Sequence, residues 1–146
     1  MKCMLQRVSQ ASVTVAGEPV GAIGQGLLVL AGLEKGDDRA RVARMCDRLL
    51  GYRIFSDGEG RMNRSVTDIQ GGLLLVSQFT LAADTKKGAR PSFSSAAAPE
   101  LAQSLFSYFT ELTQERHCGP VATGRFAADM QVSLINDGPV TFLLET

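Results

Sequence analysis

The sequence has very little of the side-chain chemistry that nucleophilic catalysis usually needs. Its 146 residues include no tryptophan, two tyrosines, three cysteines and a single histidine, His117. Because an activated nucleophile is normally paired with a base, one histidine argues against a Ser-His-Asp triad. His117 ends a predicted helix, where a solvated side chain near the last carbonyls is expected. A dyad with Cys118 is disfavoured, since sequence neighbours in a helix do not face each other.

An excess of charge of one sign is also missing. Fifteen Lys and Arg residues balance fifteen Asp and Glu residues. No general positive field exists to hold a long nucleic acid, so we expect RNA contacts to be local and DNA not to be a partner. The cysteines, Cys3, Cys46 and Cys118, are odd in number and form no CxxC spacing. This pattern favours free thiols in a reducing compartment over disulfides or a metal site.

Long hydrophobic runs are absent as well. No apolar stretch approaches a membrane span, and the N-terminus has no long apolar segment of the signal-peptide kind. We therefore expect a cytoplasmic protein with no membrane partner. With 45% hydrophobic residues, the chain can bury one good core but is too short for two ordinary domains. The sequence predicts a single domain over 1–146.

The first third of the chain is rich in β-forming residues. Strands are predicted at 2–9 and 12–15, followed by a turn at 16–19 and a hairpin partner at 20–23, which together suggest a β-meander. The all-apolar run 26–32 is bounded by glycines. It predicts a strand that is covered on both faces.

Two helices are predicted after these strands. Asp37 or Asp38 can cap the first helix, and Gly51 is suited to end it. Pro99 at a first helical position opens the second helix, which runs to about Arg116 with apolar residues at helical spacing. These apolar residues are Leu101, Leu105, Phe106, Phe109 and Leu112.

Further strands are predicted at 72–78, 130–135 and 140–144. The last two are joined by a turn over 136–139. The pattern as a whole predicts an α+β domain of mostly antiparallel strands with two main helices.

Two polar segments lie at the ends of apolar strands. In Ser77-Gln78-Phe79-Thr80-Leu81, strand alternation would turn Gln78 and Thr80 to one face and Ser77 and Phe79 to the other. Gln78 and Thr80 could then bind one ligand. Taken alone, such a pair is more often a polar couple satisfied by local partners.

The second polar segment is Asn136-Asp137-Gly138-Pro139-Val140-Thr141. Proline lacks a backbone N–H and can hold a cis peptide bond at modest cost. The Gly138-Pro139 pair therefore offers carbonyl oxygens without an amide donor, and a pocket lined in this way can exclude a substituent by shape. The alternative is structural: between two strands, the four residues 136–139 would form an ordinary hairpin turn.

A polar loop is predicted between these segments, at 82–95. Lys86, Lys87 and Arg90 make it locally basic, and their usual role is to form a solvated surface. Because the loop is close in sequence to Thr80, contact with phosphates is the alternative.

Seven segments, in their order and spacing, resemble the D-aminoacyl-tRNA deacylases, a family of chiral proofreading enzymes. The resemblance spans essentially the whole chain. The segments are Gln6–Val8, Ala11–Val15, Gly51–Phe55, Ser77–Asp84, Arg90–Phe93, Thr123–Phe126 and Asn136–Phe142.

The resemblance implies a homodimer of partial-barrel subunits whose active sites lie at the subunit interface. It implies hydrolysis of the ester that joins a D-amino acid, or glycine mischarged on tRNA(Ala), to the terminal adenosine of tRNA. No metal or organic cofactor is implied. The alternative function is a non-catalytic module that binds an RNA end or a small ligand.

The resemblance also assigns roles to residues. Ser77, Gln78, Phe79 and Thr80 would line the pocket for the adenosine and the ester. Gly138 and Pro139 would be the Gly-cisPro motif, which enters the partner's pocket and rejects L-aminoacyl groups. Arg7 and Asn136 would support these loops. Attack by water with help from the ribose 2′-hydroxyl is favoured over covalent attack by Thr80, because no general base is visible near that residue.

Overall fold

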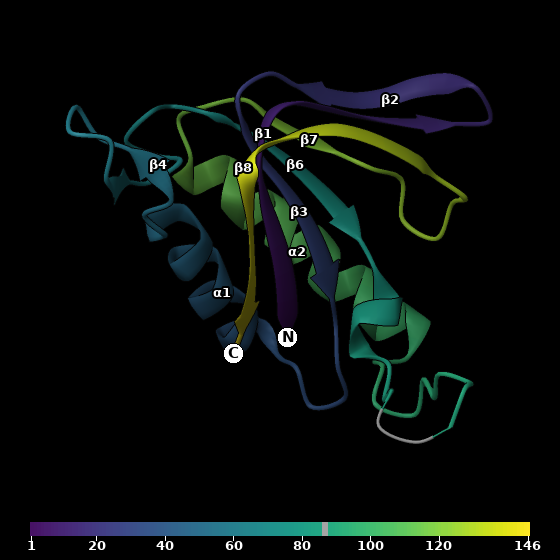
Figure 1. The fold of residues 1–146 in the computed structure, drawn as a ribbon. Coiled ribbons are helices and arrows are strands. Elements are labelled where there is room, and N and C mark those ends of the chain that lie inside the picture. The colour runs from purple at the N-terminus through teal and green to yellow at the C-terminus, as the bar shows by residue number, and fades with distance from the viewer. Residues whose placement is uncertain (86–87) are drawn as a thin grey trace.

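A fourteen-residue strand, β1 (Lys2–Val15), organises the sheet in the computed structural model, which describes residues 1–85 and 88–146 (Figure 1). The sequence expectations for Lys86 and Lys87 therefore lie outside the described residues. The remaining elements are β2 (Glu18–Ile23), β3 (Gly26–Gly32), α1 (Arg39–Gly51), β4 (Phe55–Ser56), β5 (Met62–Arg64), β6 (Gly72–Ser77), the 3-10 helix η1 (Phe79–Ala82), α2 (Pro99–Arg116), β7 (Val121–Thr123) and β8 (Gln131–Glu145).

β1 uses both of its edges. It pairs antiparallel with β2 over Ala11–Val15 and with β3 over Lys2–Val8. β8 pairs antiparallel with β1 along nearly its whole length. Because a strand has only two edges, β2 and β3 follow one another along the edge that β8 leaves open. The predicted hairpin between β1 and β2 is confirmed, but the β-meander is wrong, since the two returning segments pair with β1 rather than with each other.

The other half of the sheet is parallel. β3 pairs with β6, and β6 pairs with β7. Gly26 lies opposite Gly72 at the start of the first pair, and a Cβ atom at Gly26 would overlap the carbonyl oxygen of Gly72. The two strands can begin together only because that position has no side chain. The result is a mixed sheet that nearly closes into a barrel, so the expected α+β class is confirmed.

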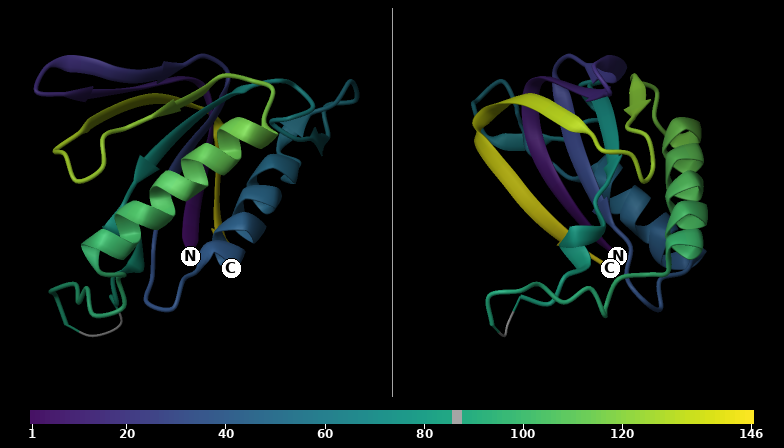
Figure 2. Two further views of the ribbon diagram at one scale, coloured as in Figure 1. Left: turned by 180° about the vertical axis from the view of Figure 1, so that it is seen from behind. Right: turned by 90° about the vertical axis from the view of Figure 1, so that its right-hand side faces the viewer.

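Both helices pack on the same face of the sheet (Figure 2). They bury the larger of two apolar clusters, in which Leu5, Val29 and Leu75 from the sheet meet Leu49 and Phe109 from the helices. Burying one such side chain fully contributes about 1.5–3 kcal/mol. This layer therefore supplies most of the free energy that holds the helices to the strands.

A smaller cluster forms on the opposite face, inside the curl of the sheet. Alternation along the central strands sends Leu27 and Val29 toward the helices and Leu28 toward Val13 and Leu74. The prediction that residues 26–32 are covered on both faces is confirmed.

Of the two candidate N-caps of α1, the structure selects Asp38, whose carboxylate accepts a hydrogen bond from the Arg41 amide at 2.8 Å. Asp37 is buried and has different partners. It lies 2.6 Å from the α-amino group of Met1 and accepts a hydrogen bond from the Glu34 amide at 2.7 Å. A carboxylate with both an ionic and an amide partner offsets its cost of burial.

Helix α2 has the predicted limits, although Leu101 is exposed rather than part of its apolar face. The expectation of a solvated His117 is wrong. The backbone becomes extended at this residue, and the side chain is buried. Its Nε2 donates to the carbonyl of Gly71 at 2.8 Å. Within the described ranges, no helix is both long and apolar enough to cross a bilayer.

The two C-terminal strands and their hairpin turn are not observed. Residues 131–145 form a single strand, and both halves of it pair with β1. Thr141 faces Gln6 and Asn136 faces Val8, so the register shifts between these pairs. The segment 136–139 is therefore a bulge within one strand. The prediction failed because the long free edge of β1 offers partners to both halves.

Candidate functional site

The polar segment after β6 leaves the sheet at Ser77. The Gln78 amide still donates to the Ala31 carbonyl at 2.8 Å, and the chain then turns into η1. Strand alternation therefore does not apply to Phe79 and Thr80. Gln78 and Thr80 nevertheless meet, since Gln78 Nε2 donates to Thr80 Oγ1 at 2.6 Å.

Gly32 at the end of β3 makes room for this segment. A Cβ atom there would lie 2.8 Å from Leu81 Cβ and 3.1 Å from the Gln78 carbonyl oxygen, closer than such atoms normally approach. Sequence reasoning overlooked Gly32. The available signal was a glycine that ends an apolar strand, which often marks a close approach of another backbone.

A hollow of about 530 Å³ opens beside the segment. Ser77, Gln78 and Phe79 line it, whereas Thr80 does not. The rest of its wall is mainly apolar and comes from the end of β3, the start of α2 and the loop before β8. These residues are Ala31, Leu33, Val76, Ala96, Ala97, Pro99, Ala102, Phe126, Ala127, Ala128, Asp129, Met130 and Val132.

Phe126 and Met130 are the large side chains of this wall that sequence reasoning did not select. Phe126 packs against Phe106 of α2 with ring centroids 6.2 Å apart. Met130 approaches Gly124 closely, since a Cβ atom at Gly124 would lie 2.6 Å from the Met130 sulfur. The resemblance at Thr123–Phe126 was the signal that pointed to this loop.

Two backbone N–H groups stand at the start of η1, those of Phe79 and Thr80. The first N–H groups of a helix have no acceptor within it. Among the described residues, the amides of Phe79 and Thr80 have no other protein acceptor either. Such a pair of amides can bind an anionic or carbonyl oxygen.

Thiols offer no alternative nucleophile in the core. Burial raises the pKa of Cys3 to about 12. Burial also raises the pKa of Cys46, although a hydrogen bond with Thr113 opposes this shift. Both thiols therefore stay protonated near neutral pH and react poorly. Within 1–85 and 88–146, no three His, Cys, Asp or Glu side chains gather as metal ligands would.

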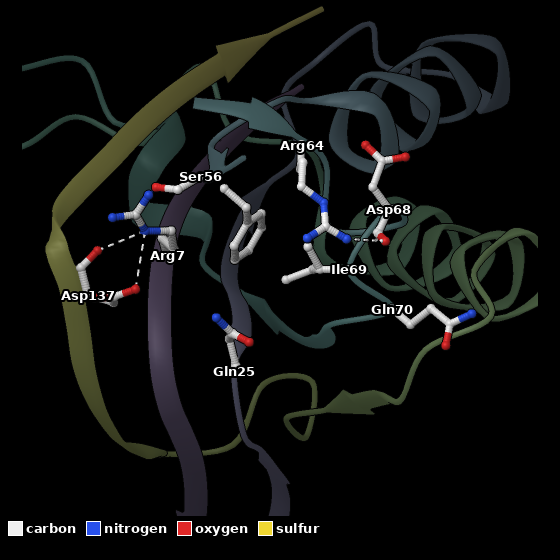
Figure 3. A pocket seen from close by; sticks show the side chains of 9 residues that line it. Arg7, Gln25, Ser56, Arg64, Asp68, Ile69, Gln70 and Asp137 are labelled. Carbon is white, nitrogen blue, oxygen red and sulfur yellow. Dashed lines mark hydrogen bonds and ion pairs between the residues drawn. The ribbon is translucent and has the colours of Figure 1, made fainter. Parts of the chain in front are cut away.

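The second polar segment lies at the bulge of β8, where Figure 3 shows Arg7 reaching from β1 toward Asp137. Arg7 Nε donates to the Asp137 carbonyl at 2.9 Å, and its Nη1 donates to the Ile54 carbonyl at 2.7 Å. Its side chain is largely buried. One guanidinium thus ties the bulge to the segment that follows α1.

Arg7 and Asp137 also line a separate polar hollow of about 550 Å³ (Figure 3). Arg64 and Asp68 contribute a second pair of opposite charges to it. Its other residues are Gln25, Phe55, Ser56, Ile69 and Gln70.

Asn136 holds the bulge from within. Its Oδ1 accepts from the Val140 amide at 2.7 Å, and its Nδ2 donates to the Val140 carbonyl at 3.3 Å and to Thr141 Oγ1 at 3.1 Å. These bonds enclose Gly138 and Pro139, which are exposed and joined by a cis peptide bond.

The predicted site residues fall into two groups within one chain. Ser77, Gln78 and Phe79 line the apolar hollow, whereas Arg7 borders the polar one near Gly138 and Pro139. No described residue lines both hollows. Figures 1 and 2 place η1 and the bend of β8 at different ends of the sheet. A single chain does not bring the two groups together.

Comparison with known proteins shows which family this chain resembles. The family model described as D-Tyr-tRNA(Tyr) deacylase matches residues 4–145. The chain belongs to this family.

Curated relatives named D-aminoacyl-tRNA deacylase agree over the full length. The protein from Azotobacter vinelandii is 63% identical, with 99% of each chain covered. That from Pseudomonas fluorescens is 62% identical, with 100% of each covered. The chain is therefore an enzyme of a hydrolase family, and the resemblance found in its sequence is confirmed.

Solved structures share the fold. One titled "c-Myc DNA Unwinding Element Binding Protein" has a TM-score of 0.96 and 40% identity, covering 100% of this chain and 99% of its own. Another is titled as a probable eukaryotic D-amino acid tRNA deacylase. Its TM-score is 0.82, and the match covers 98% of this chain and 97% of that one. At 20% identity, the second supports the fold alone.

Asn136→Ala should lower the free energy of unfolding by about 1–3 kcal/mol, because the buried Val140 amide loses its acceptor. Gln131→Ala, an exposed change in the same strand, should leave stability within about 0.5 kcal/mol of the wild type. Urea denaturation followed by circular dichroism measures both variants. Equal stabilities for the two variants would show that the Asn136 bonds do not hold the bulge.

Proposed function

We propose that the protein hydrolyses the ester of D-aminoacyl-tRNA, and of glycine mischarged on tRNA(Ala), and spares L-aminoacyl-tRNA. The observation that carries the proposal is the apolar hollow edged by Ser77, Gln78 and Phe79, in a chain that matches the deacylase family over residues 4–145. The products are the free amino acid and tRNA.

The terminal adenosine suits the apolar hollow. The volume of the hollow, about 530 Å³, lies within the range of small-molecule sites, which are mostly apolar with a few polar groups. Phe126 and Met130 offer an aromatic and a polarisable surface to a base. Ser77 and Gln78 supply the polar edge, next to the start of η1.

The chemistry requires little from the side chains, because the ester of an aminoacyl-tRNA is already activated. A water attacks the carbonyl carbon, the bond to the ribose oxygen breaks, and that oxygen takes up a proton. The Phe79 and Thr80 amides would stabilise the oxyanion, and one such donor contributes about 10²-fold to 10³-fold to the rate. The ribose 2′-hydroxyl positions or deprotonates the water.

Selectivity is assigned to the carbonyl oxygens of Gly138 and Pro139. Proline has no N–H, so this surface offers acceptors only. An L side chain collides with these oxygens whereas a hydrogen does not, so D-residues and glycine pass. Specificity of this kind works by rejection, and it predicts tolerance of many D side chains.

These two residues would act on the pocket of a partner subunit. In one chain they lie away from the apolar hollow, and they are exposed at the bulge. Ile135 and Leu143 of the same strand are 54% and 52% exposed. Exposed apolar side chains on both sides of the bulge favour a homodimer whose active sites combine residues of two chains. Arg7 and Asn136 hold the bulge in place.

The main test follows the loss of amino acid from charged tRNA. Purified protein should deacylate D-Tyr-tRNA and Gly-tRNA(Ala) and leave L-Tyr-tRNA intact over the same time. Rapid loss of the L ester would contradict rejection by Gly138 and Pro139. Loss of none of the esters would favour the alternative function, a module that binds an RNA end.

Two changes test the source of the nucleophile. Thr80→Ala should keep kcat/KM for D-Tyr-tRNA within about 10-fold, because it removes only one neutral hydrogen bond, to Gln78. A D-Tyr-tRNA ending in 2′-deoxyadenosine should react at least about 100-fold more slowly with the wild type. An inactive Thr80→Ala that still binds substrate would restore covalent attack, and a normal rate on the deoxy substrate would exclude assistance by the RNA.

A charge-insertion variant tests the shared active site. Ile135→Arg combined with Leu143→Arg should convert a dimer into a monomer in sedimentation velocity, since two charges would enter an apolar contact. D-Tyr-tRNA deacylation should fall with dissociation. Met62→Arg is the control for adding a charge at an exposed apolar residue, because Met62 is 50% exposed and belongs to another strand, β5. A fully active and selective monomer would refute the interface site.

A further inference from the structure

Two aromatic rings lie side by side on the surface next to the apolar hollow. Phe79 of η1 is 59% exposed and Phe93 is 42% exposed. Their centroids are 5.1 Å apart, with the ring planes inclined by 55°. Leaving a large apolar side chain in water forgoes about 1.5–3 kcal/mol of burial. An exposed aromatic pair of this kind marks a surface that contacts a partner.

The backbone around Phe93 is fixed by hydrogen bonds. Asp84 and Ser92 form an antiparallel bridge, with bonds of 2.8 Å and 3.1 Å between their amides and carbonyls. The Ala96 amide donates to the Phe93 carbonyl at 3.0 Å. Ser95 Oγ donates to the carbonyl of Ala82 in η1. The segment that carries Phe93 is thus tied to the helix that carries Phe79.

The pair lies at the rim of the hollow. Phe79 lines the hollow and is more than half exposed, so its ring borders both the interior and the solvent. Phe93 extends the same aromatic surface outward. An RNA strand whose terminal nucleotide fills the hollow passes this rim when the strand leaves along the outer side of Phe79.

The surroundings favour a nucleic acid over a second copy of this chain. Arg90, Ser92 and Ser94 are exposed next to Phe93 and offer a positive charge and hydroxyl groups. Contacts between identical subunits are more apolar, and Ile135 and Leu143 of β8 provide such a surface instead. Aromatic rings beside cationic and hydroxyl groups are typical of surfaces that bind single-stranded nucleic acid.

We propose that Phe79 and Phe93 form a stacking platform for the base of the nucleotide that precedes the terminal adenosine of the RNA. The platform rests on the proposed function, because the terminal adenosine must occupy the hollow. Stacking of this kind is tolerant of base identity, since every base has a flat face. The platform therefore aligns the RNA end without reading its sequence.

The test compares two substrates that carry the same ester. D-Tyr-tRNA contains the preceding nucleotide, and D-tyrosyl-adenosine lacks it. Phe93→Ala should reduce the ratio of kcat/KM for the first substrate to that for the second by about 10-fold, within the range of about 5-fold to 150-fold that one stacked base contributes. Phe93→Leu should behave like Phe93→Ala, because it keeps apolar area without a flat face, and Phe93→Tyr should restore the ratio. Met62→Ala serves as the control for loss of an exposed apolar side chain.

A binding measurement gives a readout that does not depend on hydrolysis. An RNA oligonucleotide with the acceptor-end sequence and 2-aminopurine at the penultimate position should lose fluorescence on binding to the wild type, as the base stacks. Phe93→Ala should abolish this quenching, and Phe93→Tyr should keep it.

The remaining outcomes overturn the proposal in distinguishable ways. An unchanged ratio with unchanged quenching would show that no base stacks on Phe93. Dissociation of a dimer by Phe93→Ala would assign the aromatic pair to contact between copies of the chain. A wild type that hydrolyses neither substrate would reject the proposed function, whereas a wild type that binds the oligonucleotide without quenching would reject the platform.

Discussion

Backbone pairing along the two edges of β1 is the constraint on which the rest of the structure depends. One edge holds β2 and β3, and the other holds both halves of β8. Because β8 is a single strand paired with a fixed partner, the extra residues between Asn136 and Thr141 must project from the ladder as a bulge. The exposed Gly138-Pro139 pair is thereby placed by a rigid sheet, with Arg7 of β1 bonded to its base.

Close approach of backbones builds the other half of the site. Gly26 and Gly72 allow the first residues of β3 and β6 to approach closely. Gly32 allows Gln78 and Leu81 to pack against the end of β3. Strand β6 then gives way to η1, whose first residue, Phe79, lines the apolar hollow. The proposed hydrolysis needs a positioned water and an oxyanion donor more than it needs a strong base. The proposed mechanism therefore does not require a histidine base.

Sequence patterns predicted most of the elements but fewer of their partners. The limits of α2, the hairpin after β1 and the double coverage of β3 follow from local periodicity and turn residues. The β-meander and the C-terminal hairpin were wrong, because a hairpin signal says where a strand bends but not which edge it then joins. His117 was misplaced for the same reason, since its partner, the Gly71 carbonyl, is 46 residues away.

The sequence by itself determined the class of the fold, the family and the two signature segments, because each depends on residue types in a fixed order. It also identified Ser77, Gln78 and Phe79 as neighbours of a pocket. Only the tertiary structure decided that Phe126 and Met130 complete that pocket and that Gly138 and Pro139 lie outside it. Contacts between residues distant in the chain depend on strand register and on the curl of the sheet, and neither is encoded in a local pattern.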